Sequence, residues 1–156
     1  MAGKLLKEIR QNKPFSMVEE EAVLNISRTA EVLNRQMAEF LKTYGLSPTQ
    51  YNVLRILRGA GRDGITCSEL GGRLVTADPD ITRLLDRMET RGLVRRERSK
   101  EDRRVVVVTA AKDGLDLVDS MDQPVQAMLK KGIGKMKKKQ LQEIIELLEQ
   151  VREAAE

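Results

Sequence analysis

The sequence contains no histidine, no tryptophan, one cysteine and only 3% aromatic residues. A single cysteine cannot build an internal disulfide framework and is typical of proteins from a reducing compartment. Without histidine or closely spaced cysteines there is no recognisable metal-binding pattern. A glycine-rich phosphate loop is also missing, and the paired carboxylates fall inside helix-capping or ion-pair patterns. We therefore predict that the chain is not an enzyme and needs no metal and no cofactor.

Long apolar runs are missing as well. The first 14 residues have no apolar core beyond Leu5 and Leu6, so they do not resemble a signal peptide. No later run approaches the ~20 apolar residues that a membrane-spanning helix requires. Together with the single cysteine, this pattern predicts a cytoplasmic protein that has no membrane partner.

With so few aromatic residues, a core must come from Leu, Ile, Val, Met and Ala, which favours helices. The 156 residues suffice for one ordinary domain or for two small lobes that share a core. The net charge of +4 indicates nucleic acid only weakly. The distribution is more informative, because residues 91–104 hold seven basic and three acidic side chains.

Three capping boxes predict where helices begin. They are Ser16–Glu19, Ser47–Gln50 and Thr66–Glu69. The first predicted helix ends at Gly45, the second stops in the glycine-rich residues 59–64, and the third is short. Each cap supplies side-chain partners for backbone N–H groups that the first turn of a helix leaves unpaired.

A fourth helix is predicted to begin at Asp78, with Pro79 at its first position, and to end before Gly92. Helical spacing divides it into two faces. The predicted buried face is Ile81, Leu84, Leu85 and Met88. The predicted outer face is Thr82, Arg83, Asp86, Arg87 and Thr90. Two strand-like runs follow, at 93–98 and 105–109, and residues 99–103 suit the loop of a hairpin.

The C-terminal part is predicted to be helical from Lys112, with a kink or a restart at Pro124. Gly132–Gly134 breaks the pattern, and a last amphipathic helix runs to about Val151. The first and last helices carry wider apolar stripes than one chain of this length covers. Pairing of two copies is the economical solution, which predicts a homodimer.

A helix with outward arginines, followed by an arginine-edged hairpin, is the order found in winged helix-turn-helix proteins that bind duplex DNA. Arg83 is the first candidate to read guanine, Thr82 would contact a methyl group or a phosphate, and Arg87 lies one turn further. The alternative is a solvated face in which Asp86 pairs with Arg83.

The hairpin carries further candidates for DNA contact. These are Arg98, Lys100, Arg103 and Arg104. Arg103 is the preferred minor-groove probe, whereas the others would contact phosphate or only aid solubility.

Taken together, LSPTQYNVLRIL (46–57), DPDITRLLDRMETRGLVRR (78–96) and the triplet Asp102-Arg103-Arg104 resemble the MarR (multiple antibiotic resistance regulator) family. The resemblance covers roughly residues 18–151. It implies a mainly α fold with a small β-hairpin wing, in which a winged helix-turn-helix is flanked by N- and C-terminal dimerisation helices. The implied parts are an arm and dimerisation helix (1–45), a DNA-binding lobe (46–111) and C-terminal dimerisation helices (112–156).

The resemblance also implies a function, a homodimeric regulator of transcription, usually a repressor, that binds a pseudo-palindromic operator. A small-molecule effector acting between the lobes would release it, in a pocket drawn from the first, second and fifth helices. In the family pattern Asp102 shapes the wing, with Arg104 as its partner. This sequence departs from the pattern at Ala110-Ala111, which predicts a weak helix cap, and at the acids Asp78 and Asp80.

Two other functions remain open. A winged helix can serve as a protein-interaction module without specific DNA binding. Cys67 could act as a redox sensor, because a helix N-terminus can lower the pKa of a thiol. The peroxide-sensing branch of the family places its reactive cysteine in the first helix, where this chain has none, so a structural role for Cys67 is favoured.

Overall fold

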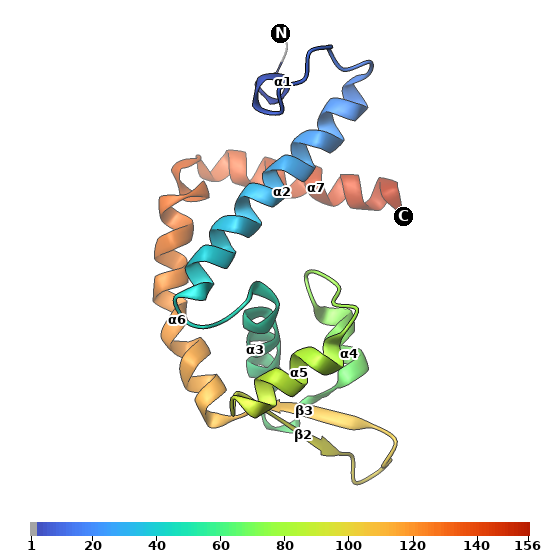
Figure 1. Cartoon of the computed structure of the whole chain (residues 1–156), viewed down its shortest axis with the longest axis vertical. Coiled ribbons are helices and arrows are strands. Elements are labelled where there is room, and N and C mark those ends of the chain that lie inside the picture. Colours follow the sequence, from blue (N-terminus) through green and yellow to red (C-terminus); the bar gives the residue numbers. More distant parts are fainter. Residues whose placement is uncertain (1–2) are drawn as a thin grey trace.

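The computed structural model describes residues 3–156 and consists of helices around one small antiparallel sheet (Figure 1). In chain order the elements, with η for a 3-10 helix, are α1 (Leu5–Glu8), α2 (Val18–Lys42), α3 (Pro48–Ala60), η1 (Gly61–Asp63), β1 (Ile65–Thr66), α4 (Cys67–Arg73), α5 (Ile81–Thr90), β2 (Val94–Arg98), β3 (Val106–Ala110), α6 (Lys112–Lys131), η2 (Ile133–Lys135) and α7 (Lys138–Ala155). The predicted fold class, mainly α with a β-hairpin wing, is confirmed.

The sheet holds the winged part of the chain together. Its strand order is β1-β3-β2, with both pairings antiparallel, so β3 lies in the middle. Val108 of β3 faces Ile65 on one side and Arg96 on the other, and its side chain is fully buried. The short strand β1 was not predicted, because two residues are too few to show an alternating pattern.

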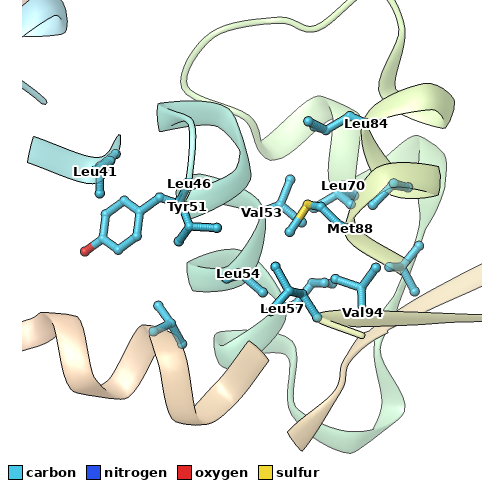
Figure 2. Close-up of a cluster of buried hydrophobic side chains, with 14 of the residues drawn as sticks. Leu41, Leu46, Tyr51, Val53, Leu54, Leu57, Leu70, Leu84, Met88 and Val94 are labelled. Carbon is cyan, nitrogen blue, oxygen red and sulfur yellow. The ribbon is translucent and has the colours of Figure 1, made fainter. Parts of the chain in front are cut away.

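The core lies between α3, α4, α5 and the sheet (Figure 2). Figure 2 shows Val53 and Leu57 of α3 lying close to Leu70 of α4 and Met88 of α5. The buried face predicted for α5 is confirmed, except that Ile81 is only half buried. Each fully buried side chain of this size contributes roughly 1.5–3 kcal/mol by leaving water.

The outer helices are far less covered. In Figure 1, α6 runs along one side of the molecule, α2 leads away from the sheet, and α7 crosses the view at a distance from the sheet. No residue of α7 is buried, and Leu41 alone is buried in α2. The large apolar side chains exposed on these two helices are Val18, Val23, Leu33, Ile145, Leu147 and Val151.

Two of the three predicted helix caps are present. Ser47 Oγ accepts a hydrogen bond from Gln50 N, and Gln50 Oε1 accepts one from Ser47 N, which completes the box. Thr66 Oγ1 accepts a hydrogen bond from Glu69 N at 3.1 Å. The box predicted at Ser16–Glu19 is wrong, because Ser16 Oγ donates to Glu20 and α2 begins only at Val18.

The C-terminal half differs from expectation at one proline. Pro124 lies inside α6, which continues from Lys112 to Lys131, so of the predicted kink or restart the restart is wrong. Buried Met121 and Val125 flank the proline, and their packing holds the helix together across the missing N–H. The break at Gly132–Gly134 is confirmed, and the short helix α1 was not predicted.

Candidate nucleic-acid interface

Helix α5 begins later than the sequence pattern suggested. Asp80, not Asp78, is its N-cap, because Asp80 Oδ1 accepts a hydrogen bond from Arg83 N at 3.2 Å. Asp78 Oδ1 in turn accepts one from Asp80 N at 2.8 Å. The predicted start at Asp78-Pro79 is therefore wrong, since two consecutive carboxylate–backbone bonds move the first helical residue to Ile81.

The outer face of α5 is exposed as predicted, and its arginine side chains are not buried in the core. Thr82, Arg83 and Arg87 are all exposed. Arg83 Nε lies 3.4 Å from Asp80 Oδ2, and the Arg83 side chain is 72% exposed. A pair at this exposure is weak, so Arg83 is free to exchange Asp80 for another hydrogen-bond acceptor.

The expected partner of Arg83, Asp86, is engaged elsewhere. Asp86 Oδ1 lies 2.5 Å from an Nη atom of Arg96 on β2. The same Arg96 side chain donates to Glu89 Oε2 through Nε at 3.1 Å and through Nη2 at 2.7 Å. The alternative of a solvated Asp86–Arg83 pair is therefore wrong in this structure, because Asp86 is used to fasten α5 to the wing.

The hydrogen bonds between Arg96 and the two carboxylates of α5 favour the charged form of the groups that they join. Hydrogen bonds from Arg96 hold the pKa of Glu89 below its ordinary value. Conversely, Glu89 and then Asp86 raise the pKa of Arg96, whose side chain is 21% exposed. Side chains alternate along β2, and Arg96 is the arginine on the face toward α5.

The tip of the wing is shaped by hydrogen bonds to its own backbone. Asp102 Oδ1 accepts a bond from Arg104 N at 2.9 Å, and Ser99 Oγ accepts one from Glu101 N at 3.2 Å. Asp102 thus contacts the main chain of Arg104 and not its guanidinium group, contrary to the pairing that the family pattern implied. These turns extend the loop to residues 99–105, beyond the predicted 99–103.

The basic side chains of the wing surround an open hollow at this tip. Arg98, Lys100 and Arg103 line it together with Ser99. Arg98 is partly committed to structure, because its Nη1 donates to the Arg103 carbonyl at 3.2 Å. Arg104 is exposed on the neighbouring surface beside Thr82 and Cys67. Four cations around one small turn form a surface suited to phosphate.

Cys67, the single cysteine, lies at the start of α4 and is partly buried. Burial raises the pKa of its thiol, and the charge of Arg96 offsets this only in part. A raised thiol pKa leaves little thiolate at neutral pH, which disfavours fast reaction with oxidants. Among residues 3–156, no group of histidine, cysteine, aspartate or glutamate side chains is placed to hold a metal ion.

A second joint links α3 to α6. Arg58 donates to Asp122 through both terminal nitrogens, at 3.0 and 3.1 Å, and to Asp119 at 2.8 Å. The bonds to Asp122 and Asp119 raise the pKa of Arg58, and Arg58 lowers the pKa of Asp122. Sequence reasoning missed this joint, because the partners are 61 and 64 residues apart.

A crevice lies where the outer helices meet the winged part. It is bounded by α2, α3 and the loop between α4 and α5, with Met37, Tyr51, Asn52 and Arg55 among its lining residues. The pocket expected from the sequence was to draw on α6 as well, and α6 contributes no residue to this crevice. None of the helices in residues 3–156 is long and apolar enough to cross a membrane.

Comparison with known proteins places this geometry in a family. The sequence model of the MarR family matches residues 46–106, from the end of the turn after α2 to the start of β3. The solved MarR transcription factor from Planctomyces limnophilus is 38% identical, has a TM-score of 0.68, and covers 86% of this chain and 98% of that chain. The Bacillus subtilis HTH-type transcriptional regulator MhqR is 25% identical over 126 residues, 81% of this chain and 86% of that protein.

The same fold occurs in a structure determined with nucleic acid. The MepR–DNA complex of S. aureus has a TM-score of 0.74 at 16% identity, and covers 83% of this chain and 94% of that chain. At this identity the likeness shows the fold alone. All three relatives are named as transcription regulators or as a DNA complex, and none as an enzyme, in agreement with the prediction that the chain does not catalyse a reaction.

Proposed function

The chain belongs to the MarR family of DNA-binding transcription regulators, and we propose that it is a homodimeric repressor which a small-molecule effector releases from a pseudo-palindromic operator. The observation that carries this proposal is the joint between α5 and the wing. Arg96 fastens an exposed, cation-bearing helix to a basic hairpin, so both contact surfaces keep a fixed spacing. Fixed spacing is what binding to one face of a duplex requires.

In the proposed complex, α5 is the recognition helix in the major groove. Arg83 donates to a guanine, Thr82 contacts a methyl group or a phosphate, and Arg87 binds the backbone one turn further. The carboxylate of Asp80 holds Arg83 until the base replaces it. Breaking the Arg83–Asp80 pair therefore costs little free energy, because exposed pairs contribute at most ~1 kcal/mol.

The wing supplies the second contact. Arg103 reaches the minor groove, while Arg98, Lys100 and Arg104 lie along the flanking phosphates. Asp102 holds the turn that presents them. In this proposal the chain divides into an arm and dimerisation helix (1–45), a DNA-binding lobe (46–111) and C-terminal dimerisation helices (112–156).

A second copy would cover the apolar faces of α2 and α7. Val23 is 60% exposed and Leu147 is 60% exposed, on helices that bury almost nothing within one chain. A two-fold dimer would present two recognition helices about 34 Å apart, one helical turn of DNA. A regulator of this kind acts on the chromosome, so the proposal places it in the cytoplasm.

DNA from the region flanking its own gene tests the function directly. Fluorescence anisotropy at ~150 mM salt should show binding at least 1,000-fold tighter than to random duplex of equal length. Equal affinity for the two duplexes would refute sequence-specific binding. Size-exclusion chromatography with light scattering should give twice the mass of one chain.

A double variant separates this function from a protein-interaction module, and peroxide treatment separates it from a redox sensor. Arg83→Ala combined with Arg103→Ala should abolish operator binding and leave the dimer intact, whereas a protein-interaction module would show no operator binding to lose. Operator affinity that falls after peroxide treatment would instead favour a redox sensor at Cys67. We expect no change with peroxide, because burial raises the thiol pKa.

A further inference from the structure

Helices α2 and α5 end in the same way. Each closes with a Schellman motif, in which a glycine of positive φ follows the last helical turn. The glycines are Gly45, with φ 69°, and Gly92, with φ 72°. Leu46 N donates to the carbonyl oxygen of Leu41 at 3.2 Å, and the residue after Gly92 makes the equivalent bond at the end of α5. The last carbonyl groups of both helices therefore carry partial negative charge at exposed turns.

Arg91 joins these two helix ends. It is the C-cap residue of α5, and its Nη1 donates to the carbonyl oxygen of Gly45 at 2.6 Å. Within residues 3–156, this is the one hydrogen bond between residues 18–46 and residues 61–111, which include α5 and the wing. The guanidinium group lies near the C-terminal ends of two helices at once, a position that favours a cation.

Helical spacing alone would give Arg91 a different place. Arg83, Arg87 and Arg91 follow one another at intervals of four residues, which would put all three on the outer face of α5. Arg83 and Arg87 are exposed on that face, but the side chain of Arg91 reaches the turn after α2. The contact is close, because a Cβ atom on Gly45 would lie 3.1 Å from Arg91 Nη2. The charged group of Arg91 is therefore engaged by the main chain of the protein itself.

The link from Arg91 complements the pair of Arg58 and Asp122. That pair joins α3 of the winged lobe to α6, whereas Arg91 joins the end of α5 to the end of α2. A lobe attached by side chains to one outer helix can still pivot about that attachment. A second attachment, to a different outer helix, removes this freedom and fixes an angle.

We propose that Arg91 is a positioning residue for operator binding. By holding the Gly45 carbonyl, it fixes the end of the recognition helix to the end of the outer helix, and so sets how far apart the two recognition helices of a dimer lie. The two halves of a dimer reinforce each other on DNA only when this distance matches the half-site spacing. The positioning role rests on the proposed function, but the link between Arg91 and Gly45 does not.

Two duplexes, the full operator and one with a single half-site, separate positioning from direct contact. In anisotropy titrations, Arg91→Met should weaken binding to the full operator roughly five- to tenfold and change half-site affinity less than about twofold, because one lobe suffices for a half-site. A fall by the same factor on both duplexes would overturn the proposal, since Arg91 would then contact phosphate or maintain the lobe itself. Unchanged affinity for both would overturn it too. Arg62→Met, the same loss of charge at an exposed residue of η1, is the control.

A substitution at the other end of the link gives an independent test. Gly45→Ala keeps Arg91 but places a Cβ atom against its guanidinium group, in a turn whose φ of 69° also strains an alanine. Gly61→Ala is the matched control, because its φ is also 69° and its Cβ meets nothing within 4 Å. Gly45→Ala should reproduce the selective loss on the full operator, and Gly61→Ala should not. Equal ratios of full-operator to half-site affinity in these two variants would contradict a positioning contact.

Amide hydrogen exchange of the free protein tests the link without DNA. Arg91→Met should speed exchange of the Leu46 amide roughly fivefold, because the turn at Gly45 loses its support, and should leave the Val108 amide in the central strand unchanged. Unchanged exchange at Leu46, or equal acceleration at both amides, would overturn the link. A wild type that binds the operator no better than random DNA would refute the proposed function, while selective acceleration at Leu46 would leave the link standing.

Discussion

Arg96 on β2 and Glu89 on α5 are joined by two side-chain hydrogen bonds, at 2.7 and 3.1 Å, and by a third at 3.0 Å from Arg96 N to Glu89 Oε1. Both side-chain bonds end on Glu89 Oε2 and the backbone bond ends on Oε1, so both carboxylate oxygens are held and the orientation of the pair is fixed as well as its distance. The wing and the recognition helix are therefore set at one relative angle, and the DNA contacts proposed for both depend on this angle.

Arg96→Met should loosen the wing. The side chain is only 21% exposed, so we expect a loss of about 1–2 kcal/mol in the free energy of unfolding, after a discount for the exposed carboxylates. Operator affinity should fall as well, because the wing is no longer aligned with α5. Arg95→Met, on the exposed side of the same strand, is the control. A variant with wild-type stability would show that the pair is not structurally important.

The same pair predicts a dependence on pH. The pKa of Glu89 is lowered in the folded protein, so its contribution is fully present above the ordinary value of 4.5. It is lost as the pH falls through the lowered folded pKa. The stability difference between wild type and Glu89→Gln should therefore be constant from pH 7 to about 5 and shrink below that range. Urea titrations at several pH values measure it, and a difference that persists unchanged at low pH would contradict it.

Substitutions of Arg83 and Arg103 should weaken DNA binding in different ways. Arg83→Ala removes a base contact, so it should cost about 1–3 kcal/mol on the operator and much less on random DNA. Arg103→Ala removes a cation from the negative potential of the minor groove, so it should weaken binding to both duplexes and lower the slope of log affinity against log salt by about 1. Anisotropy titrations over a range of salt separate the two. Lys138→Ala, an exposed cation on α7, is the charge-matched control and should change neither value.

Local sequence patterns predicted most helices and strands of the winged part, but not the ion pairs that join them. The spacing of Leu84, Leu85 and Met88 is a property of a few neighbouring residues, so the buried face of α5 could be predicted. The partner of Asp86 could not, because Arg83 and Arg96 are equally plausible from charge alone. Only the paired geometry of α5 and β2 brings Arg96 to that carboxylate. The start of α5 was misjudged for a related reason, since Asp78 and Asp80 are both good caps.

The close packing of α6 at Gly114 also could not be predicted from local sequence. A Cβ atom at this position would collide with the Leu93 carbonyl oxygen, so the close approach of α6 to the start of β2 depends on the missing side chain. Gly114→Ala should destabilise the fold by about 1–3 kcal/mol. Gly59→Ala is the matched control, because a Cβ there meets nothing within 4 Å and helix propensity should make it slightly stabilising. Equal effects in thermal unfolding would contradict the close contact.

The pair of Arg58 and Asp122 should control the spacing of the two recognition helices in a dimer. Their bidentate pair, at 3.0 and 3.1 Å, fixes α3 of the winged lobe against α6. Asp122→Asn removes the charge that holds the guanidinium, so the lobe should swing more freely relative to the outer helices. A freer lobe tolerates more operator geometries, and its binding depends less on half-site spacing.

The test uses operators with one or two base pairs inserted between the half-sites. The wild type should lose affinity steeply with each insertion, and Asp122→Asn should lose less while binding the unaltered operator more weakly. Asp116→Asn is the control on the same helix, because within residues 3–156 Asp116 pairs only with exposed Lys112 one turn away. Asp122→Asn that discriminates spacing as sharply as Asp116→Asn would show that the α3–α6 pair does not set the distance between the reading helices.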